Sequence, residues 1–256
     1  MYPAWIRQPD TQPYIQRLNK NFTGYHQLKG FINTTVASVK GRVDFPVYRY
    51  AEGLLIYAEA QAELSKLTQV DLDRSINLLR KRAGLPNLDL VKANAVIDPF
   101  LAEKYPNLSG NNRGVLLEIR RERRVEMAFE NSRYDDLMRW QAGNLLARIP
   151  EGMYFPKLGN YDLTGDGVDD IVLIDKATSI PAEQNKEKNS LGITLIYYRA
   201  GSTSDDVTVY LRNGANGGTM ATETASRKFE EPKFYYRPVP QQQVLFNPQL
   251  KQIFGW

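Results

Sequence analysis

LEIRRERRVEMAFENSRYDDLMRW, at residues 117–140, is the stretch that decides the fold of this 256-residue chain. Good helix formers predict one helix over 113–130 and a second over 133–142. Five consecutive charged residues, Arg120 to Arg124, sweep right round a helix at roughly 100° per residue. A packed helix must therefore turn some of these charges toward its neighbours, and a buried ion-pair network is expected.

Acidic residues recur on the same helix at every fourth position, where like charges repel unless cations lie between them. Arginines of the segment, with Arg133 and Arg139, can supply those cations, because the planar guanidinium suits partly buried carboxylates. Two carboxylates on one helix face could instead serve as an acid and a base. So many neighbouring arginines should lower the carboxyl pKa values, which favours a structural network. The four acids are Glu118, Glu122, Glu126 and Glu130.

Upstream, an alanine- and leucine-rich segment at 48–66 predicts a helix that is buried on several sides. A further helix is expected over 71–83, with Asp71 as its N-cap, Gly84 as the residue after its C-cap and Pro86 blocking continuation. Two helices joined by a short loop form an antiparallel hairpin of the size of one tetratricopeptide unit.

The character of the chain changes after about residue 150. Segments 193–199 and 206–212 have strand composition and are bounded by Gly, Asn and Ser. Four prolines predict an extended tail. We therefore expect a mainly α fold of tetratricopeptide-like hairpins with a small β-rich insertion and long irregular loops. The expected division is an irregular stretch of the same domain at 1–46, a helical core at 47–150, the β-rich insertion at 151–229, and a tail packing back on the core at 230–256.

A short loop in the insertion has the spacing of a calcium site. Oxygen-bearing side chains alternate, a glycine follows, and a backbone carbonyl and a last carboxylate complete the set, as the hard cation Ca²⁺ prefers. The loop resembles the short calcium loops of integrin-type repeats, with Thr in place of Asp or Asn at one position. The alternative is a turn rich in Asp and Gly without an ion. The candidate ligands to a structural Ca²⁺ are Asp162, Thr164, Asp166, Val168 through its carbonyl, and Asp170.

Composition excludes several classes of function. The chain has no cysteine and a single histidine, His26, which excludes thiolate catalysis and disfavours histidine-based metal or serine-hydrolase sites. The net charge of +4 is modest and interleaved, so nucleic-acid binding is not expected. No apolar run reaches the roughly 18 residues of a membrane span. The start lacks a secretion signal, so either the protein stays inside the cell or this chain has lost its beginning.

Five segments, in the same order along the chain, resemble motifs of the SusD/RagB family. They are Thr23-Gly24-Tyr25 with Lys29 and Phe31, YRYAEGLLIYAEA at 48–60, IN…R with RAGLP at 76–86, LEIRRERRVEMAFENSRYDDLMRW at 117–140, and NPQLKQIFGW at 247–256. Family members are about twice as long and begin with a lipoprotein signal and a lipidated cysteine. The resemblance is therefore to the C-terminal part, and the signal and lipid anchor are absent from this chain.

The resemblance implies a non-enzymatic, surface-facing lipoprotein of the cell outer membrane. Such a protein captures a glycan or oligopeptide and delivers it to a SusC-like TonB-dependent transporter. Sugar rings would stack on exposed aromatic side chains in the irregular N-terminal stretch, for which Tyr2, Trp5, Tyr14 and Tyr25 are candidates. The same aromatics could instead lie against the core. Two alternatives are a tetratricopeptide-like scaffold that binds only protein, and a glycoside hydrolase with an isolated carboxylate pair.

Overall fold

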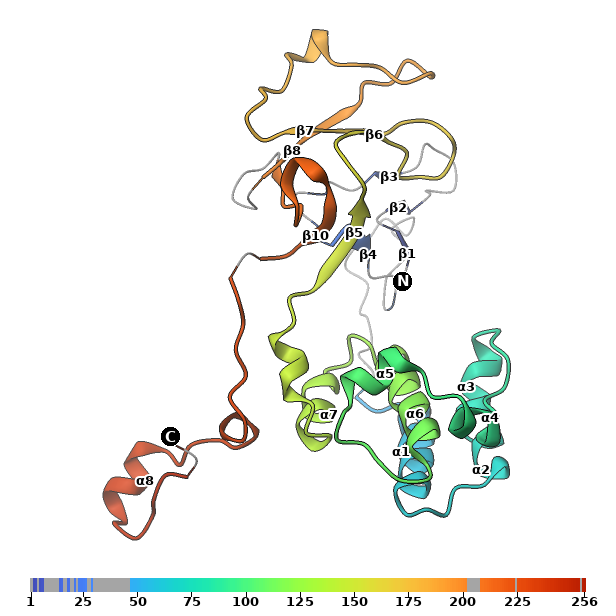
Figure 1. Cartoon of the computed structure of the whole chain (residues 1–256), viewed down its shortest axis with the longest axis vertical. Coiled ribbons are helices and arrows are strands. Elements are labelled where there is room, and N and C mark those ends of the chain that lie inside the picture. The colour runs from blue at the N-terminus through green and yellow to red at the C-terminus, as the bar shows by residue number, and fades with distance from the viewer. Residues whose placement is uncertain are drawn as a thin grey trace. The chain divides into compact units, whose positions relative to one another are not determined.

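The computed structural model divides the chain into two units, each with its own core (Figure 1). A β unit comprises Met1–Asn33 and Ala147–Lys228, and a helical unit comprises Thr34–Leu146 and Phe229–Trp256. Most of the predicted irregular stretch at 1–46 lies outside the residues that the structure describes. Those described are 2–3, 5–6, 14–15, 18, 21, 23–26, 29, 47–201, 208–223, 225–253 and 255–256.

Helices make up the first part of the helical unit, where α1 and α6 lie side by side (Figure 1). Leu55, Ile76 and Ile119 are fully buried in the core that these helices share. A second cluster forms around Trp140 and Leu137. The helices are α1 (Tyr50–Glu63), α2 (Gln69–Asp73), α3 (Ile76–Arg82), α4 (Leu90–Ala95), α5 (Pro99–Lys104), α6 (Arg113–Glu126) and α7 (Arg133–Arg139).

The single helix expected over 71–83 is wrong in two respects. It is two helices, α2 and α3, because Ser75 leaves the helical region with φ −132° and ψ −92°. The N-cap of α2 is Thr68 rather than Asp71, which stands three residues later and closes a capping box by accepting from the backbone N–H of Thr68 at 2.9 Å. The predicted ending is confirmed, since Gly84 has φ +70°.

The next two helices are shorter than expected. Helix α6 ends at Glu126, and the two residues of positive φ that follow it, Phe129 and Asn131, cannot continue a right-handed helix. Helix α7 ends at Arg139, shortly before Gln141, which also has positive φ. Helical pairs are thus present, but a tetratricopeptide-like arrangement stays a prediction.

The tail of the helical unit is extended only in part. It contains a 3₁₀ turn at Lys233–Tyr235 and helix α8 (Gln241–Phe246). Its first residues return to the end of the helices, where the backbone N–H of Gly143 donates to the hydroxyl of Tyr235 at 3.0 Å. The ring of Phe229 lies so close to Gly143 that an added Cβ would overlap it.

Short strands form the β unit. Its largest sheet has the order β6-β7-β8-β9, in which β6 and β7 are antiparallel while β7, β8 and β9 are parallel. The two predicted strands appear as β8 and β9, displaced by a few residues. The strands are β1 (Tyr2–Pro3), β2 (Trp5–Ile6), β3 (Tyr14–Ile15), β4 (Tyr25–His26), β5 (Glu151–Phe155), β6 (Gly159–Tyr161), β7 (Ile171–Asp175), β8 (Ile196–Ala200), β9 (Thr208–Val209) and β10 (Gly218–Ala221).

Three two-stranded ladders complete the β unit, and they pair β1 with β4, β2 with β3, and β5 with β10. The core of the unit is built from Phe155, Ile171, Leu173 and Leu211, all nearly or fully buried. None of the helices in the described ranges has the length and apolar character that a membrane crossing requires.

Two glycines allow a test of how tightly the helical unit is packed. Gly114 in α6 has no room for a methyl group, because an added Cβ would overlap the backbone carbonyl of Ala93 in α4. We expect Gly114→Ala to lower the free energy of unfolding in urea by about 1–3 kcal/mol, the usual cost of overpacking.

Gly53→Ala is the matched control, because nothing lies within 4 Å of the added Cβ on α1. Alanine there should raise the free energy of unfolding by about 0.5–1 kcal/mol, since glycine is a poor helix former. Equal effects of the two substitutions would contradict the close contact between α4 and α6.

Candidate functional site

The four candidate aromatic residues lie on two of the short ladders of the β unit. Tyr2 pairs with His26 and Pro3 with Tyr25, while Trp5 pairs with Ile15 and Ile6 with Tyr14. Tyr2 and Tyr25 therefore lie on paired strands, as do Trp5 and Tyr14, but in neither pair are the two residues direct partners in register. Tyr25 is half-buried, and its carbonyl accepts from the side-chain amide of Asn21 at 2.9 Å. Ligand binding by these residues stays a prediction.

The candidate calcium loop connects β6 to β7 and is organised by its own carboxylates. Asp162 accepts from the backbone N–H groups of Gly165 and Gly167, each at 2.7 Å. Asp170 is nearly buried and accepts from the N–H groups of Leu163 and Thr164 at 2.8 and 3.1 Å. These bonds explain how the spacing of the acids shapes the turn, as is common where Asp and Gly alternate.

Calcium binding at this loop stays a prediction. Among the described residues, no group of three or more acidic, histidine or cysteine side chains is already arranged to hold a metal ion. Burial raises the pKa of Asp170, and the nearby charges of Asp162 and Asp166 add to that rise, while backbone hydrogen bonds oppose it. A cation in the loop would relieve this repulsion among carboxylates.

The charged segment at 117–140 contributes to a buried network between α1, α6 and α7. Glu59 exposes only 5% of its surface and accepts from three donors. Arg139 donates hydrogen bonds to both of its oxygens, with Nη2 2.7 Å from Oε2, and the indole N–H of Trp140 donates to Oε1 at 2.6 Å. Beside it, Nε of Arg123 lies 2.8 Å from both oxygens of the buried Asp136. The predicted structural role of these charges is consistent with this geometry.

Three arginines from outside residues 117–140 pair with three of the four glutamates that recur at every fourth position. Arg49 bonds both Glu126 (2.9 Å) and Glu130 (2.7 Å), Arg82 adds a second cation at Glu126, and Arg80 pairs with Glu122. These partners were not predicted from the sequence, although the three arginines lie within the motifs at 48–60 and 76–86. Of the expected cations, Arg121 pairs with Glu118 and Arg139 with Glu59, while Arg133 donates to the hydroxyl of Tyr105 at 3.2 Å.

Arginines lower the pKa of two of these carboxyl groups, Glu59 and Glu126. Burial alone would raise the pKa of Glu59, but hydrogen bonds from Arg139 and Trp140 outweigh it and hold the pKa below its ordinary value. Burial is likewise outweighed at Glu126 by Arg82 and Arg49, so its pKa is also lowered. A general acid needs a raised pKa, and these carboxylates are therefore poorly suited to that role.

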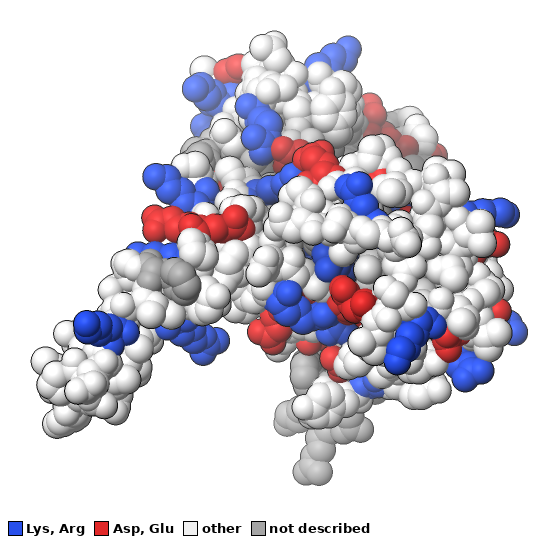
Figure 2. Space-filling model, turned by 60° about the horizontal axis from the view of Figure 1, so that its bottom comes forward, with Lys and Arg blue, Asp and Glu red and all other residues white. Residues whose placement is uncertain are grey.

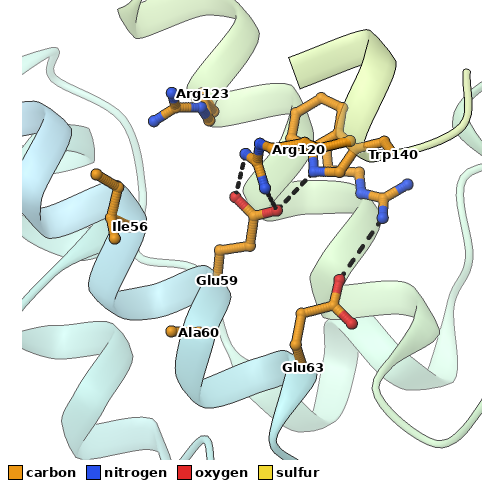
Figure 3. Close-up of a pocket in the computed structure, with 8 residues that line it drawn as sticks. Ile56, Glu59, Ala60, Glu63, Arg120, Arg123 and Trp140 are labelled. Carbon is orange, nitrogen blue, oxygen red and sulfur yellow. Dashed lines mark hydrogen bonds and ion pairs between the residues drawn. The ribbon is translucent and has the colours of Figure 1, made fainter. Parts of the chain in front are cut away.

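A cavity of about 520 Å³ opens beside Glu59 on the helical unit (Figure 3). Its walls combine the charged network with a short apolar strip from α1. Figure 3 shows Glu59 and Glu63 extending from one helix toward Arg120 and Trp140 on the other side. The lining residues are Ile56, Glu59, Ala60, Glu63, Arg120, Arg123, Arg139 and Trp140.

Charges on the outer surface are mixed in sign. Over the face of the described residues that Figure 2 shows, basic and acidic side chains lie among one another. Such a surface differs from the one-sided basic face that nucleic-acid binding requires.

Comparison with known proteins gives one match over nearly the whole chain. The sequence pattern of the SusD family matches residues 4–256. No curated protein matches the chain.

Two solved structures are similar to parts of the chain, and both are described as SusD-like proteins of Bacteroides fragilis NCTC 9343. One is 21% identical, with a TM-score of 0.43 over 82% of this chain and 25% of its own length. The other, described as a SusD-like carbohydrate-binding protein, is 25% identical, with a TM-score of 0.44 over 80% of this chain and 28% of its own length. The chain thus spans about a quarter of the length of these two proteins.

Removing the charge of Glu59 should destabilise the helical unit. We expect Glu59→Gln to lower the free energy of unfolding in urea by about 3 kcal/mol, because the arginine left behind is deprived of its buried partner. The acid sensitivity should change as well. A carboxyl whose folded pKa is lowered contributes stability above its ordinary pKa of 4.5, and this is lost as the pH falls below that value. The variant should therefore lose part of the decline in stability below pH 4.5.

Glu63→Gln, one turn later on α1, is the matched control. Glu63 is 50% exposed and lies 3.6 Å from Arg120, so its loss should change stability by at most about 0.5 kcal/mol. If the two substitutions had the same effect, Glu59 would not be the organising carboxylate.

Calcium should bind the loop that connects β6 and β7. Calorimetric titration with CaCl₂ should show binding in the range of about 0.1–1 mM, because the loop has fewer acids than a high-affinity site. Asp162→Asn and Asp166→Asn should each abolish the signal. Asp175→Asn, at the end of β7, should leave it unchanged. A flat titration of the unmodified chain, with no rise in its thermal midpoint, would remove this site from consideration.

Proposed function

Since this chain belongs to the SusD family, we propose that it captures a glycan at the surface of a bacterial outer membrane and delivers it to a TonB-dependent transporter. The family match over residues 4–256 is the observation that carries this proposal. An oligopeptide is the second class of ligand that the family resemblance allows. The anchored protein would be a surface-facing lipoprotein, and its partner a SusC-like transporter.

Aromatic residues of the β unit are the proposed binding surface. Sugar rings present flat faces of C–H groups, which pack on aromatic rings while nearby polar groups bond the hydroxyls. Trp5 and Tyr14 lie on paired strands, as do Tyr2 and Tyr25. This pairing places residues that are separated along the chain on neighbouring strands, offset by one position in register.

A purely binding role agrees with the chemistry of the helical unit. Glycosidases use a carboxyl group of raised pKa as the acid. The pKa values of Glu59 and Glu126 are instead lowered, because arginine hydrogen bonds outweigh the effect of burial. We therefore propose that the chain is not an enzyme.

The alternative proposal is a tetratricopeptide-like scaffold that binds protein alone. A groove of about 310 Å³ on the helical unit supports it, and its lining residues include Tyr50, Leu54 and Leu78 together with Arg49 and Arg82. An amphipathic helix that lays its apolar face into the groove would match it.

A glycan panel measured by isothermal titration calorimetry separates these proposals. We expect at least one neutral oligosaccharide to bind, and Trp5→Ala and Tyr25→Ala each to weaken it by about tenfold, because a stacked ring contributes about 0.5–1.5 kcal/mol beyond its buried area. Released reducing sugar should stay at background.

Tyr134→Ala is the control, because Tyr134 is an exposed aromatic of α7 outside the proposed surface. It should leave binding unchanged. Binding of neither glycans nor peptides would favour the scaffold, and steady release of reducing sugar would show an enzyme.

A further inference from the structure

The cavity beside Glu59 is lined by two arginines, each of which has a buried side-chain nitrogen without a hydrogen-bond partner among the described residues. Arg120 exposes only 6% of its surface, yet its buried Nε has no hydrogen-bond partner. Its nearest carboxylate is Glu63, at 3.6 Å from Nη2, which is beyond the usual range of a charged hydrogen bond. A buried guanidinium in this state has lost its water and has not regained equivalent partners.

The aromatic neighbours of Arg120 hold its guanidinium in place without accepting hydrogen bonds from its N–H groups. The guanidinium carbon lies 4.7 Å from the ring centre of Trp140 and 5.1 Å from that of Tyr105. These contacts orient the flat group by cation–π attraction, but they accept no conventional hydrogen bond from its N–H groups. Burial lowers the pKa of Arg120, and neighbouring carboxylates only partly offset the effect. The position therefore favours an added negative charge.

A second buried arginine in the cavity wall also has a side-chain nitrogen without a hydrogen-bond partner in the described part of the chain. Arg123 also exposes 6% of its surface, and its Nη1 has no hydrogen-bond partner although Asp136 binds its Nε. On the opposite wall, Ile56 and Ala60 provide an apolar strip. The cavity thus has a cationic side and an apolar side, within the volume range of small-molecule sites.

From this arrangement we propose that the cavity binds a small organic acid, with Arg120 as the charge partner of its carboxylate. The carbon skeleton of the ligand lies along Ile56 and Ala60. Arg123 lines the same cavity and adds positive charge beside the ligand. Guanidinium groups bind carboxylates through paired, charge-assisted hydrogen bonds, so the chemistry of the site selects an acid over a neutral polyol. This site belongs to the helical unit and does not rest on the proposed capture of glycan by the β unit.

The two glutamates of the cavity have opposite relations to such a ligand. Glu59 is fully engaged by Arg139 and Trp140, so it has little capacity to compete for Arg120. Glu63 is half-exposed and pairs only loosely with Arg120. An incoming carboxylate must displace Glu63 and is repelled by it. Neutralising Glu63 should therefore strengthen binding, a gain that general damage to the fold would not produce.

Calorimetry with glucuronate and glucose tests the proposal, because these sugars differ only in a terminal carboxylate or hydroxymethyl group. On the complete chain, glucuronate should bind at least about tenfold more tightly than glucose, as expected for charge-assisted hydrogen bonds. Glu63→Gln should strengthen glucuronate binding several-fold. Arg120→Gln should weaken it by about tenfold or more.

Arg121→Gln is the matched control, since Arg121 is the adjacent residue of α6 and pairs instead with Asp98 and Glu118. It should leave the affinity unchanged. Equal binding of the two sugars, or no binding of either, would overturn the proposal. So would tighter binding of glucuronate that neither Glu63→Gln nor Arg120→Gln alters, because the acid would then bind elsewhere. Should Arg120→Gln fail to fold, Glu63→Gln alone decides the outcome.

Discussion

Burying an ionised carboxylate away from water costs several kcal/mol unless other groups replace its hydrogen bonds to water. In the helical unit, Glu59 is such a carboxylate, and its neighbours supply these hydrogen bonds. One guanidinium and one indole N–H bind that carboxylate, and both come from Arg139 and Trp140 at the end of α7. Helix α1 is therefore tied to α7 through a charge that tolerates little displacement. Arg123, which binds Asp136, ties α6 to α7 in the same way. Apolar packing can slide by a fraction of a residue at small cost, whereas a buried ion pair cannot, so these pairs fix the register of the three helices.

The same network limits the chemistry that the helical unit can perform. Carboxylates surrounded by arginine remain charged and engaged, which suits a scaffold better than proton transfer. In the cavity the pairing is incomplete, because Arg120 is flanked by rings and lies too far from Glu63 for a good hydrogen bond. Incomplete satisfaction of a buried cation is a property of the assembled helices, since it depends on which side chains fail to meet.

Local signals in the sequence predicted local structure well. The helix over 48–66 and the glycine ending at Gly84 follow from propensity and from the need for positive φ, and the motifs identified the family. The cap of α2 was assigned to Asp71 alone, and Thr68 was missed, because Thr and Asp are both common N-cap residues and only the reciprocal bonds identify the cap. The arginines from outside the segment were missed because pairing across more than forty residues has no local signature. The cavity could not be predicted for the same reason, and the parallel pairing of β7 with β8 likewise depends on distant contacts.

The division of the chain into two units has a consequence for how the protein is made. Each unit is built from two separated pieces of sequence, and the pieces alternate along the chain. During synthesis the first piece of the β unit must wait until residues beyond 147 have emerged, and Gly143 must wait for Phe229 and Tyr235. The β unit cannot be cut out as one uninterrupted fragment, because its core joins Leu18 to residues of 155–220. Late, long-range closure is therefore built into the connectivity of the β unit, whereas the buried core residues of the helical unit all lie within 51–142.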